Sequence, residues 1–273
     1  MRKHSISFII GIVLVVFAFA LASASLVLMP YDPEAMDIYN RFQGPSPAHL
    51  LGTDHFGRDI LSRIMSGSLV ALSGALVSVM LGALSGIVLG TISALSPKWI
   101  GNILQRVIDA LMAFPTILIA LVLVAIAGKG LLPSVFAIAL AMVPVFSRLV
   151  YTMMLETKEK LYVKAAVSYG SGWLRIVVFH MIPSMASRLI TQFTSSIGSA
   201  ILLESSLSFL GLGIQPPSSS LGMMLSEARS YVLTYPYQAI PSGVVLLIIV
   251  LGFNLLGDGI SEVFARRRRM RHV

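Results

Sequence analysis

Polar side chains recur every three or four residues in an otherwise apolar stretch near residues 187–207. At 3.6 residues per helical turn, this spacing places several of them on one face. Such groups hydrogen bond either with neighbouring helices or with water and a solute that passes along them, and the sequence leaves both uses open. We expect Glu204 to find a cation or to reach the mouth of a cavity, because an unpaired buried carboxylate is costly. The candidates for such a path are Gln192, Ser195, Ser196, Ser199 and Glu204, with Arg188 before them.

No motif in the sequence indicates catalysis. A Gly-x-x-x-x-Gly-Lys phosphate loop, a His-Glu-x-x-His zinc motif and a Gly-x-Ser-x-Gly nucleophile elbow are all absent. Since the chain has no cysteine, thiolate metal sites and cysteine nucleophiles are excluded. The histidines do not cluster at ligand spacing, and we expect His49 and His55 to be surface residues that a passing metal could touch. We therefore predict no catalytic residue, no cofactor and no metal site in this chain.

Composition places the elements that carry these residues in a membrane. Hydrophobic residues make up 56% of the 273 residues and charged residues 12%, whereas about a quarter of a soluble globular domain is charged. The mean hydropathy is +0.87. We therefore predict an all-α integral membrane protein in a lipid bilayer. The net charge of +8 would suggest nucleic acid as the partner of a soluble chain. In a membrane chain it reflects topology, and no nucleic-acid binding is expected.

Six segments are long and apolar enough to cross a bilayer core of about 30 Å, which takes roughly 17–25 helical residues. They lie near residues 5–29, 69–95, 108–127, 131–154, 187–207 and 239–258. In the second segment small residues recur at every fourth position, which in lipid allows close backbone contact with another helix. This stripe consists of Gly74, Ser78, Gly82, Gly86 and Gly90. We expect the second span to be tightly packed and not to face lipid.

Basic residues are distributed asymmetrically around these six spans. If the N-terminus is cytoplasmic, 15 of the 20 lysines and arginines fall on the cytoplasmic side, including the cluster Arg266–Arg269 and Arg271. The opposite side then holds only Arg41, Arg58, Arg63, Lys129 and Arg229. Because cytoplasmic loops are enriched in basic residues, we predict a multi-pass protein of the cytoplasmic membrane with both termini in the cytoplasm.

The N-terminal apolar run has features of a secretory signal peptide. Arg2 and Lys3 precede it, and the small residues Ala22, Ser23 and Ala24 lie near its end. The run is about 25 residues long, however, and the apolar core of a signal peptide is roughly 7–15 residues. We therefore expect an uncleaved first membrane helix.

Residues 30–67 follow this helix and are predicted to form an extracytoplasmic elbow at the membrane surface, since they contain several prolines. Asp54, Arg58 and Asp59 are spaced so that they can pair on a short helix. Thr53 or Asp54 is expected to cap that helix where it enters the second span.

A basic segment at residues 162–183 lies between two predicted spans, on the predicted cytoplasmic side. Ala165 and Ala166 leave a helix surface that another backbone can approach closely, and Gly170 permits a sharp exit from the helix. Pro183 is expected to set the start of the next helix. This is the pattern of a docking hairpin, and it resembles the cytoplasmic loop of ABC import permeases. That loop reads Glu-Ala-Ala, three residues, Gly, nine residues and Ile-x-Leu-Pro.

Three further stretches resemble the peptide and nickel branch of the ABC permeases, specifically the subunit that accompanies a second, different permease. They are LGTDHFGRD at residues 51–59, ESSLSFLGLGIQPP at 204–217 with LGMML at 221–225, and FNLLGD at 253–258. Together with the hairpin they run in order through most of the chain, which makes the resemblance specific. The departures are Lys164, His180 and Ile182 where the loop pattern has Glu, Ile and Leu, Leu221 where an aromatic is common, and the C-terminal arginine cluster.

The resemblance implies the fold of a type I ABC importer permease. Residues 1–68 would be a membrane anchor helix with an extracytoplasmic segment, and residues 69–273 the permease transmembrane domain. It also implies partners: a second permease chain in a heterodimer, an extracytoplasmic substrate-binding protein, and two ATPase subunits that bind ATP and Mg²⁺ and dock on a coupling loop of about residues 156–186. The ATPase-coupling residues that it implies are Lys164, Ala165, Ala166, Gly170, Arg175 and Pro183.

By the same resemblance we expect a permease subunit, not an enzyme, in an ATP-driven importer of di- or oligopeptides. Import of nickel or a metal chelate is the alternative within the family, and nothing in the residues decides between them. A membrane enzyme or a stand-alone channel is the rival from another class. An intramembrane protease would need a catalytic dyad or a metal pair at depth, and a channel usually has a filter or a ring of charge. Neither pattern is visible in the sequence.

Overall fold

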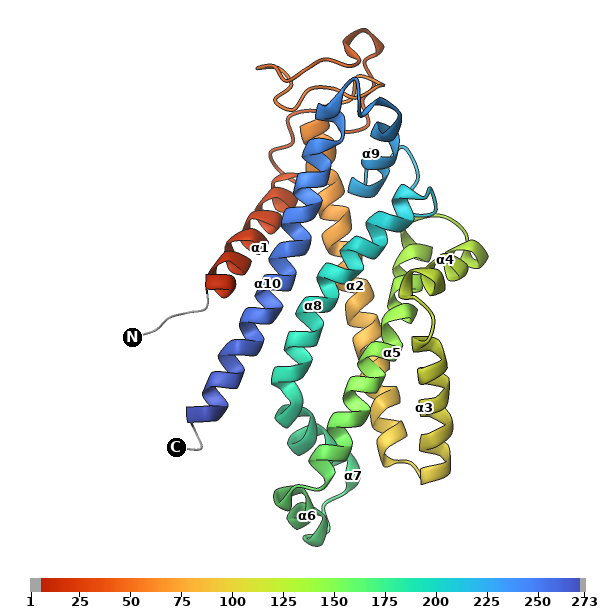
Figure 1. Cartoon of the computed structure of the whole chain (residues 1–273), viewed down its shortest axis with the longest axis vertical. Coiled ribbons are helices and arrows are strands. Elements are labelled where there is room, and N and C mark those ends of the chain that lie inside the picture. The colour runs from red at the N-terminus through yellow and green to blue at the C-terminus, as the bar shows by residue number, and fades with distance from the viewer. Residues whose placement is uncertain (1–5, 271–273) are drawn as a thin grey trace.

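The computed structural model describes residues 6–270, with side chains described as far as residue 264, and this part of the chain is helical (Figure 1). A single isolated β-bridge joins Thr53 and Asp59. The helices are α1 (Ile6–Ala24), α2 (Ile60–Leu95), α3 (Lys98–Met112), α4 (Thr116–Ala127), α5 (Leu131–Lys158), α6 (Leu161–Ser168), α7 (Trp173–Ile176), α8 (Ile182–Phe209), α9 (Leu221–Ala228) and α10 (Ile240–Met270). A π-helical turn (Val177–Met181) joins α7 to α8, and three short 3₁₀ turns lie at Ile38–Asn40, Arg229–Tyr231 and Pro236–Gln238.

Among the described residues, five helical stretches are long and apolar enough to cross a membrane: α1, α2, α5, the continuous stretch Trp173–Phe209, and Pro236–Phe264, which comprises the last 3₁₀ turn and most of α10. The predicted third span, residues 108–127, is not one straight helix. Instead α3 and α4 meet at 92° and count as a sixth span only when taken together. Pro115 explains the break, because it lacks a backbone N–H and disfavours helical geometry at Phe114 before it.

The second helix begins at Ile60 and not at residue 69 as predicted. The sequence also assigned its cap to the wrong residue, since Asp59 caps it and neither Thr53 nor Asp54 does. The Asp59 carboxylate accepts a hydrogen bond of 2.8 Å from the backbone N–H of Ser62. This is the usual way in which one of the unpaired N–H groups at a helix start is satisfied.

Helices α2 and α5 are in close contact along the small-residue stripe of α2, as the sequence predicted. A Cβ atom added to Gly86 would lie 2.5 Å from Cβ of Phe146, and one added to Gly90 would lie 2.5 Å from the carbonyl oxygen of Ser147. Ser78 Oγ crosses the same interface and donates a hydrogen bond of 3.0 Å to the carbonyl of Val135. Lipid tails do not drive helices together, so this close fit and its hydrogen bond hold the pair.

The first and last helices lie side by side (Figure 1). Glycines make this contact close on both partners. A Cβ on Gly11 of α1 would lie 2.5 Å from the backbone nitrogen of Leu256, and one on Gly259 of α10 would lie 2.7 Å from Cα of Phe8. The sequence offered no stripe that predicted this pairing.

The two ends of the helix bundle carry different segments. Residues 30–59 and α9 lie at one end, called here the outer end, and α6 and α7 lie at the opposite, inner end (Figure 1). Arg2, Lys3, His4, Arg271 and His272 fall outside the described residues, and so do the side chains of the arginine cluster Arg266–Arg269. The cytoplasmic location of both termini therefore stays a prediction.

We expect Gly86→Ala to destabilise the protein, because the added methyl group would overlap Phe146 on α5. Overpacking of this kind costs about 1–3 kcal/mol. Gly74→Ala is the matched control: it lies on the same stripe, but its Cβ would meet only side chains of Leu131 and Val135 at 3.7 Å. Thermal unfolding of the purified variants in detergent checks the difference. Equal unfolding midpoints for the two variants would contradict the close α2–α5 contact.

Candidate functional site

One face of α8 is left uncovered over most of its length. Arg188, Gln192, Ser199, Leu202 and Ser206 on this face are exposed or half-buried, and they follow one another at helical spacing. We call this the open face of α8. A membrane helix that faces lipid would carry apolar residues here, so hydroxyl and amide groups indicate contact with water or protein.

A hollow lies at each end of the open face. The inner hollow has a volume of about 330 Å³ and is lined by Leu149, Ser187, Arg188, Thr191, Gln192, Ser261 and Phe264. Arg188 there forms an ion pair of 2.9 Å with Glu156 of α5. The outer hollow, of about 280 Å³, is lined by Leu202, Ser205, Ser206, Phe209, Leu210, Leu225 and Leu246. Ser199, which is exposed, lies on the open face between the residues that line the two hollows.

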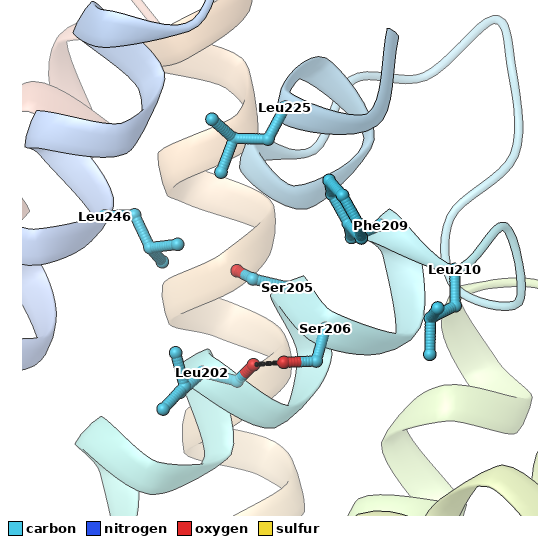
Figure 2. Close-up of a pocket in the computed structure, with 7 residues that line it drawn as sticks. All are labelled: Leu202, Ser205, Ser206, Phe209, Leu210, Leu225 and Leu246. Atoms are coloured by element: carbon cyan, nitrogen blue, oxygen red, sulfur yellow. Dashed lines mark hydrogen bonds between the residues drawn. The ribbon is translucent and has the colours of Figure 1, made fainter. Parts of the chain in front are cut away.

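Figure 2 shows the outer hollow between three helices, with Leu225 supplied by α9, Leu246 by α10 and the other residues by the end of α8. Its lining is mostly apolar. The Ser206 hydroxyl donates a hydrogen bond of 2.7 Å to the carbonyl of Leu202 within the helix. Its oxygen therefore still has lone pairs for a further partner.

The two adjacent serines among the predicted path residues differ in burial. Ser196 is 3% exposed, and its hydroxyl accepts a hydrogen bond of 3.1 Å from the amide of Gln192. Ser195 lies against α10, where a Cβ on Gly257 would come within 2.4 Å of its hydroxyl oxygen. The structure therefore brings Gln192 and Ser199 to the open face, leaves Ser195 half-buried on it at the edge of α10, and places Ser196 in helix packing.

Glu204 neither meets a cation nor reaches a cavity mouth, which corrects the expectation for this residue. Its side chain is buried, at 2% exposed, and no ion pair joins it to any described cation. The carboxyl group accepts hydrogen bonds from Ser208 at 2.7 Å and Ser205 at 3.4 Å. Ser208 in turn accepts one of 3.2 Å from the backbone N–H of Ile214. This chain of hydrogen bonds fixes the turn that follows α8.

The inner end carries the segment with the two adjacent alanines. Helix α6 is attached through Val163, which is 1% exposed and packs in a cluster with Ile176. Its opposite surface is open: Ala165 is exposed, and Lys164 forms an exposed ion pair of 2.8 Å with Glu159. Gly170 follows the helix with φ of +77°, which confirms the sharp exit that the sequence predicted.

Pro183 lies in the first turn of α8, as the sequence predicted, but the segment before it is helical and not a loop. It lies within the continuous helical stretch Trp173–Phe209, one residue into α8. The π-helical turn Val177–Met181 precedes it, and the N–H of Ile182 donates to the carbonyl of Val177, five residues earlier. The wider turn accommodates a residue that has no N–H to continue the ordinary ladder. Arg175 lies exposed at the start of the stretch.

A buried network of ion pairs holds the outer end together. Arg58 and Arg63, each 1% exposed, both contact Asp54 and both contact Glu227 of α9. Arg58 lies 2.7 Å from Asp54 and 3.0 Å from Glu227, and Arg63 lies 2.9 Å from Glu227. Burial alone would raise the pKa of Asp54, but the charges of Arg63 and Arg58, together with hydrogen bonds from the backbone N–H groups of Arg58 and Phe56, hold the pKa below its usual value. We call these four residues the outer clasp.

The sequence predicted only part of this network. The Asp54–Arg58 pair forms, but in a loop and not on a short helix. Asp59 does not join that pair: it caps α2 and contacts His49 Nδ1 at 2.9 Å. His49 and His55 are partly buried and not exposed surface residues. The His49 ring is tilted against Tyr31, and the His55 ring is stacked near Tyr231.

Comparison with known proteins identifies the family. The family described as "Binding-protein-dependent transport system inner membrane component" matches residues 86–270. The chain belongs to this family. It is similar to the glutathione transport system permease protein GsiD of Pectobacterium atrosepticum, with 40% identity over 91% of this chain and 83% of that protein. It is also similar to the dipeptide transport system permease protein DppC of Alkalihalophilus pseudofirmus, with 35% identity over 96% of this chain and 86% of that protein.

The fold is that of a known importer. A chain of the MetNI methionine ABC transporter, solved in inward-facing conformations, superposes with a TM-score of 0.60 at 16% identity, over 74% of this chain and 95% of that one. The binding-protein-dependent permease is thus a multi-pass inner-membrane component of an ABC importer. It is a transporter subunit without catalytic activity, as predicted, and membership of this family implies ATPase and binding-protein partners.

Proposed function

We propose that this permease forms one half of the membrane passage of an ATP-driven importer of short peptides, the class that includes dipeptides and glutathione. The observation that carries the proposal is the open face of α8, which carries hydroxyl and amide groups at the inner and outer hollows and between them. Two relatives that align over most of the chain are named for glutathione and dipeptide transport, which supports the substrate class.

The chemistry of the open face favours peptide over nickel. A peptide presents N–H and C=O groups, which pair with the amide of Gln192 and the hydroxyls of Ser199 and Ser206. A metal ion would be bound best by carboxylate or imidazole ligands. The open face carries neither, and the nearby carboxyl group of Glu204 is turned into the protein and bonded to serines. None of the relatives described above is named for nickel.

The same geometry supports the proposed assembly. The open face of α8 needs a cover, and a second, different permease chain would supply it in a heterodimer. Two ATPase subunits, which would bind ATP and Mg²⁺, would dock on the loop of about residues 156–186 at the inner end (Figure 1), where most α6 residues are exposed. The substrate-binding protein would then dock at the outer end, with both termini of this chain in the cytoplasm.

In this proposal α6 transmits the movement. Closure of the ATPases would displace α6, and the continuous stretch Trp173–Phe209 would carry that displacement to the open face, because α7, the π-turn and α8 form one helical unit. Transport then requires that the helices have two arrangements and that the ATPases stabilise one of them more than the other. Lys164, Ala165, Ala166, Gly170 and Arg175 are the proposed contact residues, with Pro183 inside the transmitting helix.

Gly170→Val is expected to uncouple ATP hydrolysis from uptake, since a β-branched residue is strained at φ of +77°. Membrane insertion should be unchanged, because the residue lies outside the spans. Gly172→Val is the matched control: a Cβ meets no atom within 4 Å at either glycine, but Gly172 has φ of −62°. The measurements are chain level, ATPase retention and uptake in reconstituted complex. Normal uptake by the Gly170 variant would remove this turn from the coupling element.

Ser199→Leu is expected to lower uptake several-fold with assembly and basal ATP hydrolysis intact, because it places a bulky apolar group between the two hollows. Ser73→Leu is the control, an equal change at an exposed serine of α2. Uptake and ATPase activity are measured in proteoliposomes. If the two variants transport equally well, the open face is not the path.

The substrate class is tested with the complete importer and its own binding protein in proteoliposomes. We expect ATP-dependent uptake of a labelled dipeptide or glutathione and no uptake of nickel. Uptake of nickel or its chelate without peptide uptake would overturn the substrate proposal, and uptake that needs no ATPase would overturn the importer assignment itself.

A further inference from the structure

Three residues of the outer clasp line a small cavity. Its volume is about 10 Å³, and it is lined by Asp54, His55, Ile60, Arg63, Met224, Glu227, Ala228 and Gln238. These residues come from three separate parts of the chain: residues 54–63, α9, and the 3₁₀ turn before α10. The cavity therefore lies where the outer ends of α2, α9 and α10 meet.

Three buried polar atoms on this lining have no hydrogen-bond partner among the residues that the structure describes. They are Nδ1 of His55, Nη2 of Arg63 and Nε2 of Gln238. The side chains are held in place by other contacts: Arg63 through its ion pairs, and His55 by the ring of Tyr231 at 5.6 Å. Buried polar groups in folded proteins are almost always satisfied. Three such atoms around one cavity require a common partner.

We propose that this cavity is a binding site for one ordered water molecule, which bridges His55, Arg63 and Gln238. Room of roughly 10–15 Å³ is what one water requires, and a buried water typically makes about three hydrogen bonds. The water oxygen accepts from the N–H groups of Arg63 and Gln238, and one water hydrogen is donated to His55 Nδ1. This needs neutral His55 with its proton on Nε2. Burial of the ring lowers the pKa of His55, which favours that neutral form.

The charges around the cavity argue against an ion. One ligand atom each from Asp54, His55 and Glu227 lies within 4.8 Å of the others, a grouping that could hold a metal. Both carboxylates, however, already contact Arg58 and Arg63, and a divalent cation would be repelled by these guanidinium groups. An anion would be repelled by the carboxylates. A neutral ligand that both accepts and donates fits the three unpartnered atoms.

The water site links the start of α2 to the start of α10. Arg63 belongs to α2, and Gln238 lies in the turn that leads directly into α10. The ion pairs of Arg63 connect α2 to α9 and to the loop at Asp54. The bridging water adds the connection to α10, so we expect its loss to weaken the outer end without affecting the inner end.

The first test is a density map of the complete importer at a resolution that shows ordered waters. We expect a single peak within hydrogen-bond distance of His55 Nδ1, Arg63 Nη2 and Gln238 Nε2. Absence of the peak, in a map that shows other buried waters, overturns the proposal. Two results would show a metal in place of the water and overturn the proposal. One is stoichiometric metal in the purified protein, and the other is a thermal unfolding midpoint that a chelator lowers or that added zinc or nickel raises.

The second test is a double-mutant cycle on thermal unfolding of the purified importer. His55→Phe keeps the ring stack and removes Nδ1, and Gln238→Met keeps the chain length and removes the donor. We expect each to lower the midpoint by a few degrees and the pair to lower it little further, because either change releases the same water. Gln238→Met with His49→Phe is the control pair, since His49 contacts Asp59 outside the cavity. The changes in midpoint caused by the two substitutions of this control pair should be additive. Additive effects for His55 and Gln238 as well would contradict a shared water.

Discussion

The close contact between α2 and α5 is the interaction on which the other helices depend. A bilayer offers no hydrophobic force to bring helices together, so a helix pair is stable only where backbones approach closely and polar groups are satisfied. Gly82, Gly86 and Gly90 allow that approach, and Ser78 adds a hydrogen bond across it. Helices α1, α3, α4, α6, α8, α9 and α10 each contact at least one member of this pair, and α3 and α8 contact both. The pair thus positions both the open face of α8 and the segment around α6.

The sequence predicted the helical class, most of the spans and the stripe on α2, because apolar length and small-residue spacing are local properties. The bend between α3 and α4 was missed, since apolar composition continues through it and only Pro115 marked the break. The sequence also did not predict that the helical stretch Trp173–Phe209 is continuous, because here a proline is present without a break. Pro183 suggested that a loop precedes the helix, but a π-helical turn joins α7 to α8 without a loop.

The candidate site was predicted less completely, because which face of a helix stays open depends on its neighbours. Helical spacing grouped Ser196 with Gln192 and Ser199, yet only packing shows that Ser196 points into the bundle. We expected Glu204 to find a cation or a cavity mouth, because the sequence does not show that the hydroxyls of Ser205 and Ser208 turn toward its carboxyl group. The pairing of Arg63 with Glu227 joins residues far apart in sequence. No local pattern indicates such a pair.

Because α1 packs against α10, the first helix of this permease reaches its main partner only when the last helix has been synthesised. Synthesis at roughly 5–20 residues per second leaves an interval on the order of 10–45 s between completion of α1 and the start of α10. During that interval α1 has only α2 beside it, and the backbone around Gly11 lies open to lipid or to a chaperone of the insertion machinery. A chain that stops before residue 240 would keep its first helix in the bilayer without its principal neighbour, as a target for membrane quality control.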